Sequence, residues 1–314
     1  MPRILQNGPL APWLETALAR DHEVVALHKQ PDREAFLAAE GASFEGLATS
    51  ARVGADRALL QALPKLRVIS SFGVGYDALD LACVRERGIA VGYTPDVLND
   101  CVADTAFGLV MDVARGFSAA DRFVRRGDWL RGQFPLTTKV SGKRLGILGL
   151  GRIGRVVAKR AGGFDMEVRY HNRRALADVP YGYEPTPQSL ARWADFLVVI
   201  SAGGAGTRHL VDAAVLDALG PQGFLVNVSR GTVIDQDALV EALRTRAIAG
   251  AGLDVYEDEP KVPPALYDLD NVVLLPHVAS ATNETRRAMA ELVLRNLNTF
   301  FATGTVPVAV PTNA

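Results

Sequence analysis

Short hydrophobic runs of strand length alternate along the chain with longer segments in which apolar residues recur at helical spacing. This alternation is typical of parallel strands joined by crossover helices, so the sequence predicts an α/β protein. In the first hundred residues the predicted strands cover residues 3–6, 23–27, 44–48, 68–71 and 89–91. Together they predict one small parallel sheet.

A second series of predicted strands covers residues 145–149, 168–171, 196–201, 224–229, 252–255 and 272–275. Six strands make a complete doubly wound sheet of the Rossmann type. Segments 97–115 and 284–301 have the apolar spacing of long helices and follow the first and the second series. Each is placed to carry the chain from one domain to the other.

Composition and charge exclude several functions. With 314 residues, 48% of them hydrophobic, the chain is long enough for two globular domains. The 34 lysines and arginines nearly balance the 35 aspartates and glutamates, which argues against a nucleic-acid partner. No stretch reaches the roughly 18 uninterrupted apolar residues of a membrane span. Because Cys83 and Cys101 are too few for a disulfide framework, we expect a cytoplasmic protein.

A glycine-rich segment follows the predicted strand that starts at Leu145. It reads Gly149-Leu150-Gly151-Arg152-Ile153-Gly154 and opens the helical segment 153–161. In such a context the first glycine forms a tight turn, the second admits a pyrophosphate, and the third lets helix and strand approach closely. The sequence therefore predicts a dinucleotide site, and an ordinary glycine-rich turn is the weaker interpretation.

The next predicted strand ends in basic residues. An NAD site normally has an acidic residue at this place, about 20 residues after the glycines, to bind the adenosine ribose. This chain has Asn172, Arg173 and Arg174 instead. Two guanidinium groups favour a 2′-phosphate, so we expect NADP(H) as the cofactor rather than NAD(H). A solvated basic turn is the alternative.

Three chemically complementary residues follow three later strands. They are Arg230, Glu259 and His277, and the carboxyl ends of parallel strands meet at one edge of a sheet. Arginine binds carboxylates, histidine exchanges protons near neutral pH, and glutamate orients an imidazole and favours its charged form. This set suits hydride transfer to a 2-oxo acid and requires no metal. Each residue alone also has a plain structural explanation.

Four ordered motifs in this chain resemble the D-2-hydroxyacid dehydrogenases. They are the glycine segment 149–154, Asn227-Val228-Ser229-Arg230-Gly231, the segment 253–260, and Leu275-Pro276-His277-Val278-Ala279-Ser280. The segment 71–77 also resembles a substrate-domain loop of that family, so the resemblance spans nearly the whole chain.

The resemblance implies a split architecture. A flavodoxin-like substrate-binding domain, formed by residues 1–97 and 283–314, would flank an NADP-binding Rossmann domain at 98–282. It also implies the site residues: Arg230, Glu259 and His277 as the catalytic set, and Val74 and Gly75 as backbone donors to the substrate carboxylate. Asp254 would lie near the nicotinamide carboxamide, and Val228 and Ser229 would border the cofactor. Family members are commonly dimers, so a homodimer is expected.

Within the family, the Asn172 to Arg174 run and the segment 134–139 look most like NADPH-dependent glyoxylate/hydroxypyruvate and hydroxyphenylpyruvate reductases. Two positions depart from the family pattern. Asp165 stands where a glycine is frequent, and aspartate tolerates a left-handed turn, so we expect only local adjustment there. Ala202 replaces a frequent proline. Trp129 and Phe134 either pack in a core or shape a substrate pocket.

These features lead to one functional expectation. The protein reduces a small 2-oxo acid such as glyoxylate or hydroxypyruvate, with His277 as proton donor, Glu259 as its partner and Arg230 on the substrate, and the resemblance implies the D product. Hydroxyphenylpyruvate reduction is an alternative. A non-catalytic NADP(H)-sensing protein is another, because a fold alone does not fix activity. The missing acidic ribose partner and the short tail disfavour a phosphoglycerate dehydrogenase, and Glu259 disfavours a formate dehydrogenase.

Overall fold

The computed structural model describes residues 1–311, and their contacts divide the chain into two units. Unit 1 combines Met1–Leu98 with the residues from Ala281 onward, and unit 2 is Asn99–Ser280. These junctions lie within two residues of the predicted ones.

Unit 1 is built on a five-stranded, all-parallel sheet. Its strands are β1 (Arg3–Gln6), β2 (Glu23–Ala26), β3 (Gly46–Ser50), β4 (Val68–Phe72) and β5 (Ala90–Gly92), in the spatial order β2-β1-β3-β4-β5. That order is the flavodoxin-like one. The fold predicted for this part of the chain is therefore confirmed.

Helices cover both faces of this sheet. One face carries α1 (Pro12–Asp21) and the long α11 (Asn283–Thr303), which packs against β4. The other carries α2 (Arg33–Glu40), α3 (Arg57–Gln61) and α4 (Leu81–Glu86) around a buried core that includes Leu5, Phe44 and Leu60. Beyond α11, the chain returns along β5, where Val310 N donates to Val91 O and so covers the sheet edge.

Unit 2 is built on a seven-stranded parallel sheet, one strand more than predicted. The strands are β6 (Arg144–Leu148), β7 (Glu167–His171), β8 (Gly182–Tyr183), β9 (Phe196–Val199), β10 (Phe224–Asn227), β11 (Gly250–Leu253) and β12 (Val272–Leu274). Their order is β12-β11-β10-β9-β6-β7-β8, which is the doubly wound Rossmann arrangement with an added edge strand. The missed strand, β8, is two exposed residues long and has no hydrophobic pattern.

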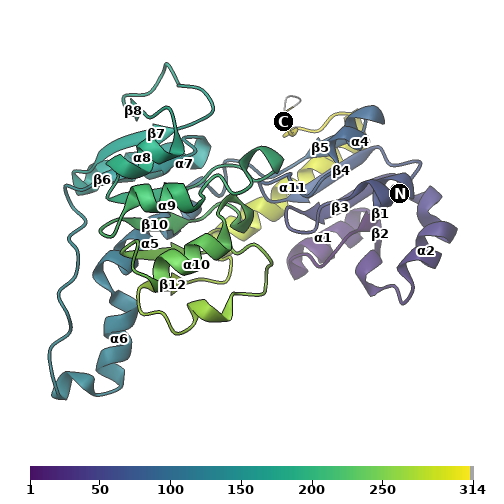
Figure 1. Cartoon of the computed structure of the whole chain (residues 1–314). Helices are drawn as coiled ribbons and strands as arrows, with labels where there is room; N and C mark the ends of the chain where they lie inside the picture. Colours follow the sequence, from purple (N-terminus) through teal and green to yellow (C-terminus); the bar gives the residue numbers. More distant parts are fainter. Residues whose placement is uncertain (312–314) are drawn as a thin grey trace. The chain divides into compact units, whose positions relative to one another are not determined.

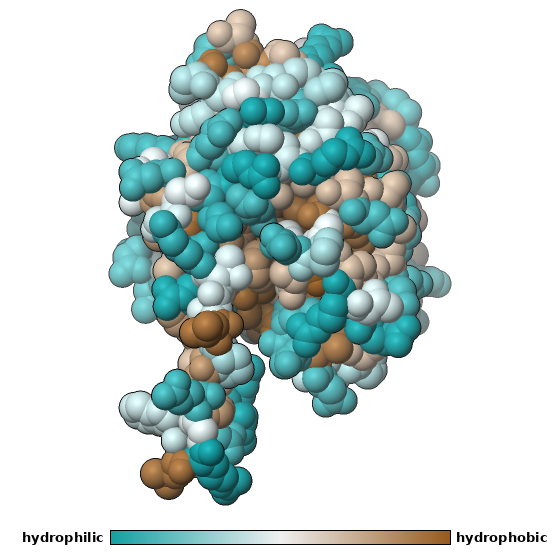
Figure 2. Space-filling model, turned by 60° about the vertical axis from the view of Figure 1, so that its left-hand side comes forward, coloured by the Kyte–Doolittle hydropathy of each residue, from teal (hydrophilic) through white to brown (hydrophobic). Residues whose placement is uncertain are grey.

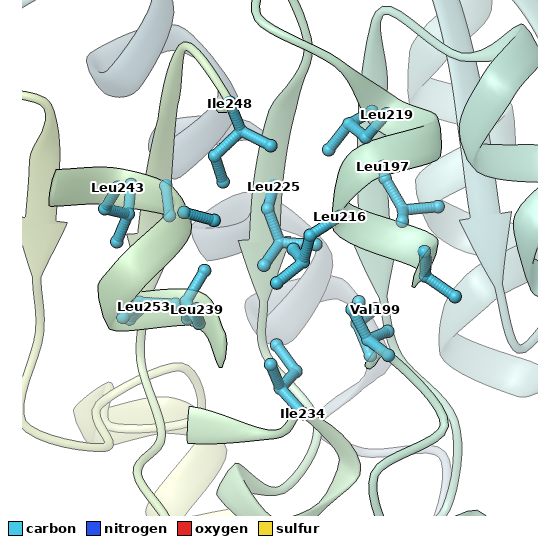
Figure 3. Close-up of a cluster of buried hydrophobic side chains, with 14 of the residues drawn as sticks. Leu197, Val199, Leu216, Leu219, Leu225, Ile234, Leu239, Leu243, Ile248 and Leu253 are labelled. Carbon is cyan, nitrogen blue, oxygen red and sulfur yellow. The ribbon is translucent and has the colours of Figure 1, made fainter. Parts of the chain in front are cut away.

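Helices also cover both faces of the larger sheet (Figure 1). One face packs against α5 (Asn99–Arg115), next to which lies α7 (Arg152–Ala161). The other face carries α8 (Pro187–Trp193), α9 (Ala213–Leu219) and α10 (Gln236–Arg244). Figure 3 shows the core on that side, where leucines of β9, β10 and β11 meet Leu216, Leu239 and Leu243 of α9 and α10.

Side chains at the strand ends explain why some predicted boundaries were wrong. The segment 224–229 stops being a strand at Asn227, because the Asn227 side chain accepts hydrogen bonds from Ser229 and turns the chain. β11 starts at Gly250 rather than at 252, since Gly250 and Ala251 pair with β10 although neither is a typical strand residue. Asp165 adopts φ 52°, the left-handed turn predicted for it.

Helix α6 (Phe117–Arg125) and the segment that follows it project from the rest of unit 2 (Figure 1). No residue of α6 is buried, and Trp129 is 69% exposed, so Trp129 does not pack in a core. Phe134 is half-buried beside Phe123, with ring centroids 5.5 Å apart. Within residues 1–311, no helix is both long and apolar enough to cross a membrane.

Candidate active site

The glycine turn after β6 has the geometry of a dinucleotide cradle. Gly149 has φ 109°, and a Cβ there would lie 2.6 Å from Ser201 N, so the turn fits tightly against the end of β9. A Cβ on Gly154 would lie 2.4 Å from Gly149 O, which shows how closely α7 approaches the strand. A Cβ on Gly151 would meet nothing within 4 Å. Open space therefore lies beside Gly151 at the start of α7, the end of a helix at which phosphate oxygens are bound.

The cradle also lies where a ligand is expected on general grounds. β6 and β9 are neighbours in the sheet, and the chain leaves them in opposite directions, so the turn sits at the topological switch point. The Ser201 hydroxyl beside it is buried and has no hydrogen-bond partner within residues 1–311. A buried polar atom without a partner is costly unless a ligand or water completes it. These features fit a bound dinucleotide.

The side chain of Asn172, at the end of β7, is hydrogen-bonded to the backbone of the glycine turn. Its Oδ1 accepts a hydrogen bond from Leu150 N at 2.7 Å, and its Nδ2 lies 3.4 Å from Leu150 O. The Asn172 side chain is therefore engaged with the turn itself. A direct contact between this amide and a cofactor stays a prediction.

The two arginines after Asn172 are exposed. Within residues 1–311, neither Arg173 nor Arg174 pairs with a carboxylate, whereas nearby Arg155 binds Asp178 at 3.1 Å. Free guanidinium groups at the end of the second strand suit a 2′-phosphate better than an uncharged ribose.

The loop after β10 is tied together by one side chain. Asn227 Oδ1 accepts from Ser229 N at 3.0 Å and from Ser229 Oγ at 2.7 Å, while Asn227 Nδ2 donates to Arg230 O at 3.1 Å. Val228 and Ser229 are buried. The predicted site residue Arg230 thus leaves a fixed loop, and its Nη1 donates to Ser229 O at 2.9 Å.

The loops after β10 and β11 are in direct backbone contact. A Cβ on Gly231 would lie 1.8 Å from Tyr256 C and 2.1 Å from Tyr256 O, so only glycine fits at this position. Tyr256 is itself buried, and its hydroxyl donates to Leu275 O at 3.0 Å. Burial raises the pKa of Tyr256 to about 12, which keeps it a neutral donor. Gly231 and Tyr256 therefore set the spacing between Arg230 and Glu259.

His277 follows β12 in a strained but well-supported conformation. Its φ is 55°, and its backbone N donates to Asp254 O at 2.9 Å. The Asp254 carboxylate is fully buried and accepts from Val278 N at 2.7 Å and from Ala279 N at 2.9 Å. Burial raises the pKa of Asp254, against the effect of these two amides. The observed role of Asp254 is to hold the His277 loop, and its contact with a nicotinamide stays a prediction.

The structure brings His277 and Glu259 together. His277 Nδ1 lies 2.7 Å from Glu259 Oε2, and Tyr256 N donates to Glu259 Oε1 at 3.3 Å. The His277 side chain is 36% exposed, whereas that of Glu259 is 16% exposed. Since Nδ1 is engaged by the carboxylate, Nε2 is the nitrogen left to meet a substrate.

Arg230, Glu259 and His277 all lie beyond the carboxyl ends of neighbouring strands, β10, β11 and β12. Val74 and Gly75 belong to unit 1, where they follow β4 and are half-buried. Gly73 just before them has φ 137° and donates from its N to Thr94 Oγ1 at 3.0 Å.

Sequence reasoning missed the residues that hold this site in place. The supporting residues lie inside the motifs at 227–231 and 253–260, but the sequence predicted no separate role for them. They are Asn227, Gly231 and Tyr256. The signal for Asn227 was a polar residue at the end of a buried strand. Nothing in the sequence marks the contact between Gly231 and Tyr256, because it joins two loops 25 residues apart.

Comparisons with known proteins agree with this geometry. The sequence profile of the family described as "D-isomer specific 2-hydroxyacid dehydrogenase, NAD binding domain" matches residues 107–279. The chain belongs to the D-isomer specific 2-hydroxyacid dehydrogenase family. The predicted family, the fold and the assignment as an oxidoreductase are therefore confirmed, as is a nicotinamide-dinucleotide-binding domain within unit 2.

Several relatives of this dehydrogenase are similar along nearly its whole length. Glyoxylate/hydroxypyruvate reductase A of Arabidopsis thaliana is 45% identical over 95% of this chain and 96% of its own. Hydroxyphenylpyruvate reductase of Plectranthus scutellarioides is 46% identical over the same shares. The crystal structure of the NADPH-dependent glyoxylate/hydroxypyruvate reductase of Sinorhizobium meliloti, in complex with NADP and malonate, superposes with a TM-score of 0.94. Its sequence is 43% identical, and the match covers 99% of this chain and 97% of that one.

Proposed function

We propose that this dehydrogenase reduces a small 2-oxo acid, glyoxylate or hydroxypyruvate, to the 2-hydroxy acid with NADPH. The observation that carries the proposal is the 2.7 Å contact between His277 Nδ1 and Glu259 Oε2, beyond the strand ends where Arg230 also lies. A carboxylate on one imidazole nitrogen leaves the other nitrogen oriented for proton transfer, as reduction of a carbonyl requires.

The preference for NADPH rests on the end of β7. Arg173 and Arg174 would bind the 2′-phosphate, and the start of α7 beside Gly151 would bind the pyrophosphate. When bound, the cofactor supplies the hydride. The relative from Sinorhizobium meliloti, described as NADPH-dependent, supports the same preference.

The chain's own residues supply the remaining chemistry. The Arg230 guanidinium binds the substrate carboxylate and stabilises negative charge that grows on the carbonyl oxygen. Protonated His277 donates the Nε2 proton to that oxygen. Glu259, 2.7 Å from Nδ1, keeps the imidazole aligned so that Nε2 faces the carbonyl oxygen. The assignment of Val74 and Gly75 as amide donors to the substrate carboxylate rests on the family resemblance, as does the D product.

Two other functions are tested by the same measurement. The 46% identical relative named hydroxyphenylpyruvate reductase supports a larger aromatic 2-oxo acid as substrate. A sensor that binds NADP(H) without turnover would need the dinucleotide cradle but not the pairing of His277 with Glu259.

The deciding experiment compares initial rates with glyoxylate, hydroxypyruvate, phenylpyruvate and hydroxyphenylpyruvate, each with NADPH and with NADH. We expect the highest kcat/KM for NADPH with glyoxylate or hydroxypyruvate. A higher kcat/KM with hydroxyphenylpyruvate would assign the aromatic substrate. NADPH binding without turnover on any of the four acids would support the sensor.

We also propose a homodimer that uses the projecting segment of unit 2. Among residues 117–136, large apolar side chains are exposed, and Leu130 and Leu136 are almost fully so. In Figure 2 this projection carries apolar side chains at its base and at its tip, among hydrophilic ones. Exposed apolar surfaces of this kind mark protein interfaces.

The two cysteines are free thiols, which supports a reducing compartment such as the cytoplasm.

A further inference from the structure

The loop that carries Glu259 is held by a second carboxylate, two residues earlier. Glu257 Oε1 accepts from Arg208 Nη2 at 2.6 Å and lies 3.3 Å from His209 Nε2. Arg208 and His209 belong to the loop after β9. The segment 257–259 therefore contains two acids that each bind a histidine from a different loop: Glu257 binds His209, and Glu259 binds His277.

The backbone between the two acids is short and fixed. Glu257 N donates to Gln236 Oε1 at 3.1 Å, and Tyr256 N donates to Glu259 Oε1 at 3.3 Å. The same peptide is packed against Gly231. Glu257 directly follows Tyr256, whose N binds the Glu259 carboxylate, so the contacts of Glu257 also hold the peptide that orients Glu259.

His209, which contacts Glu257, is also held in place by its surroundings. His209 has φ 50°, its N donates to Thr232 O at 2.9 Å, and its Nδ1 lies 3.9 Å from Asp235 Oδ2. A non-glycine residue in a left-handed conformation persists only where its surroundings hold it. His209 and His277 share this feature, and each faces an acid of the segment 257–259.

An ordinary role in stability does not account for this arrangement. Arg208 is 56% exposed, and ion pairs of such exposure contribute little to the free energy of unfolding. The loop that contains Arg208 begins at Ser201, against the glycine turn at Gly149. The ion pair therefore connects the loop beside the dinucleotide cradle with the loop that carries Glu259.

We propose that Glu257, held by Arg208 and His209, is a positioning residue for the Glu259–His277 pair. It acts through Glu259 and touches neither substrate nor cofactor. The inference rests on the proposed function, since it gives Glu257 a role in proton transfer. A misplacement of a catalytic group by about 1 Å is enough to lower turnover strongly.

The test compares the full-length variants Glu257→Gln, Arg208→Gln and their double variant. The matched control is Glu241→Gln, which removes a carboxylate from an exposed ion pair with Arg244 of 2.7 Å on α10, away from the strand ends. We expect each single variant to lower kcat by about tenfold while the KM of the 2-oxo acid changes less than about twofold. The double variant is no slower than Glu257→Gln alone, because Glu257→Gln already removes the ion pair with Arg208. Glu241→Gln behaves as wild type.

A second measurement uses the protein without cofactor or substrate. With five histidines in the chain, the ring protons can be assigned by NMR, and the Nδ1 proton of His277 by its absence in His277→Asn. We expect the His277 Nδ1 proton to exchange slowly with solvent in the wild type and in Glu241→Gln. In Glu257→Gln it exchanges rapidly. Unchanged protection and unchanged kcat in Glu257→Gln would overturn the proposal. A fall in the melting temperature that accounts for the whole loss of kcat would overturn it as well.

The two proposals fail in different ways. If His277→Asn retains wild-type turnover, the proton-donor role of His277 is wrong, whatever Glu257→Gln does. If His277→Asn abolishes turnover and Glu257→Gln matches Glu241→Gln, only the positioning role is wrong.

Discussion

At the scale of single residues, the conformation of His277 connects backbone structure with chemistry. A residue with φ 55° is disfavoured by about 1–3 kcal/mol outside glycine, and such conformations concentrate at functional sites. Here the backbone N of His277 and the next two amides are bound by Asp254, which leaves the imidazole in one orientation towards Glu259. The fixed orientation is what a proton donor needs.

Arg173 and Arg174 permit a direct prediction about cofactor choice. Replacing both with glutamine removes the charges expected to bind the 2′-phosphate, so the KM of NADPH rises by about tenfold or more while that of NADH changes little. Initial rates with each cofactor measure this. Arg192→Gln, which removes an exposed arginine from α8, serves as the control. A double variant whose NADPH and NADH constants both match the wild type would contradict the role of these arginines.

The pairing of His277 with Glu259 was predictable from the sequence, but the contacts that hold the site residues in place were not. Residue type and a place after a strand were enough to single out His277 and Glu259, because parallel strands deliver their carboxyl ends to one edge. The engagement of Asn172 with Leu150 was not predictable, since an amide at that place suits either the turn or a ligand. Side-chain partners depend on the final position of loops that no periodicity describes.

At the scale of elements, the loops after β10 and β11 form one unit because Gly231 lets them touch. Gly231→Ala would place a Cβ 1.8 Å from a backbone carbon of Tyr256, so the loops must separate. We expect a loss of stability of about 3 kcal/mol and a nearly complete loss of turnover. Thermal unfolding followed by circular dichroism, with rate measurements, tests both.

The matched control for this variant is Gly162→Ala. Gly162 has helical φ of −58°, and a Cβ there meets nothing within 4 Å, so alanine is expected to leave stability unchanged or slightly raised. If Gly231→Ala melts at the wild-type temperature, the loops are not in the contact described above.

Element types were predicted better than element ends. Strong hydrophobic runs located eleven of the twelve strands found in residues 1–311, while β8, a two-residue exposed edge strand, has no such run. The ends depended on single polar side chains such as Asn227, which stops β10 by binding Ser229. The start of β11 was not predicted because its first residue, Gly250, is a glycine, which is not typical of strands. Gly250 packs against Val113 of α5.

At the scale of the whole molecule, two parallel sheets of different strand order follow from the alternation of strands and helices along the chain. The division into units also follows from the sequence, since the long helices α5 and α11 begin close to the two junctions. Association between copies of this chain is harder to predict from the sequence. An exposed apolar side chain and a buried one have the same sequence pattern in a short helix such as α6.

The projecting segment of unit 2 makes the oligomeric state testable. Leu130→Asp with Leu136→Asp places two charges on the exposed apolar surface, so we expect the wild type to sediment as a dimer and this variant as a monomer. Sedimentation velocity measures the state. Tyr267→Ser, at another exposed aromatic residue, is the control. Dimers that persist in the double variant would assign the interface to another surface.

The proton-donor role of His277 is tested most directly by the kcat of His277→Asn for hydroxypyruvate, measured together with NADPH binding by fluorescence titration. His28→Asn, at an exposed histidine of unit 1, is the control. We expect His277→Asn to lower kcat by about a hundredfold or more, while the Kd of NADPH stays within about twofold of the wild-type value. Wild-type kcat in His277→Asn would contradict the proton-donor role.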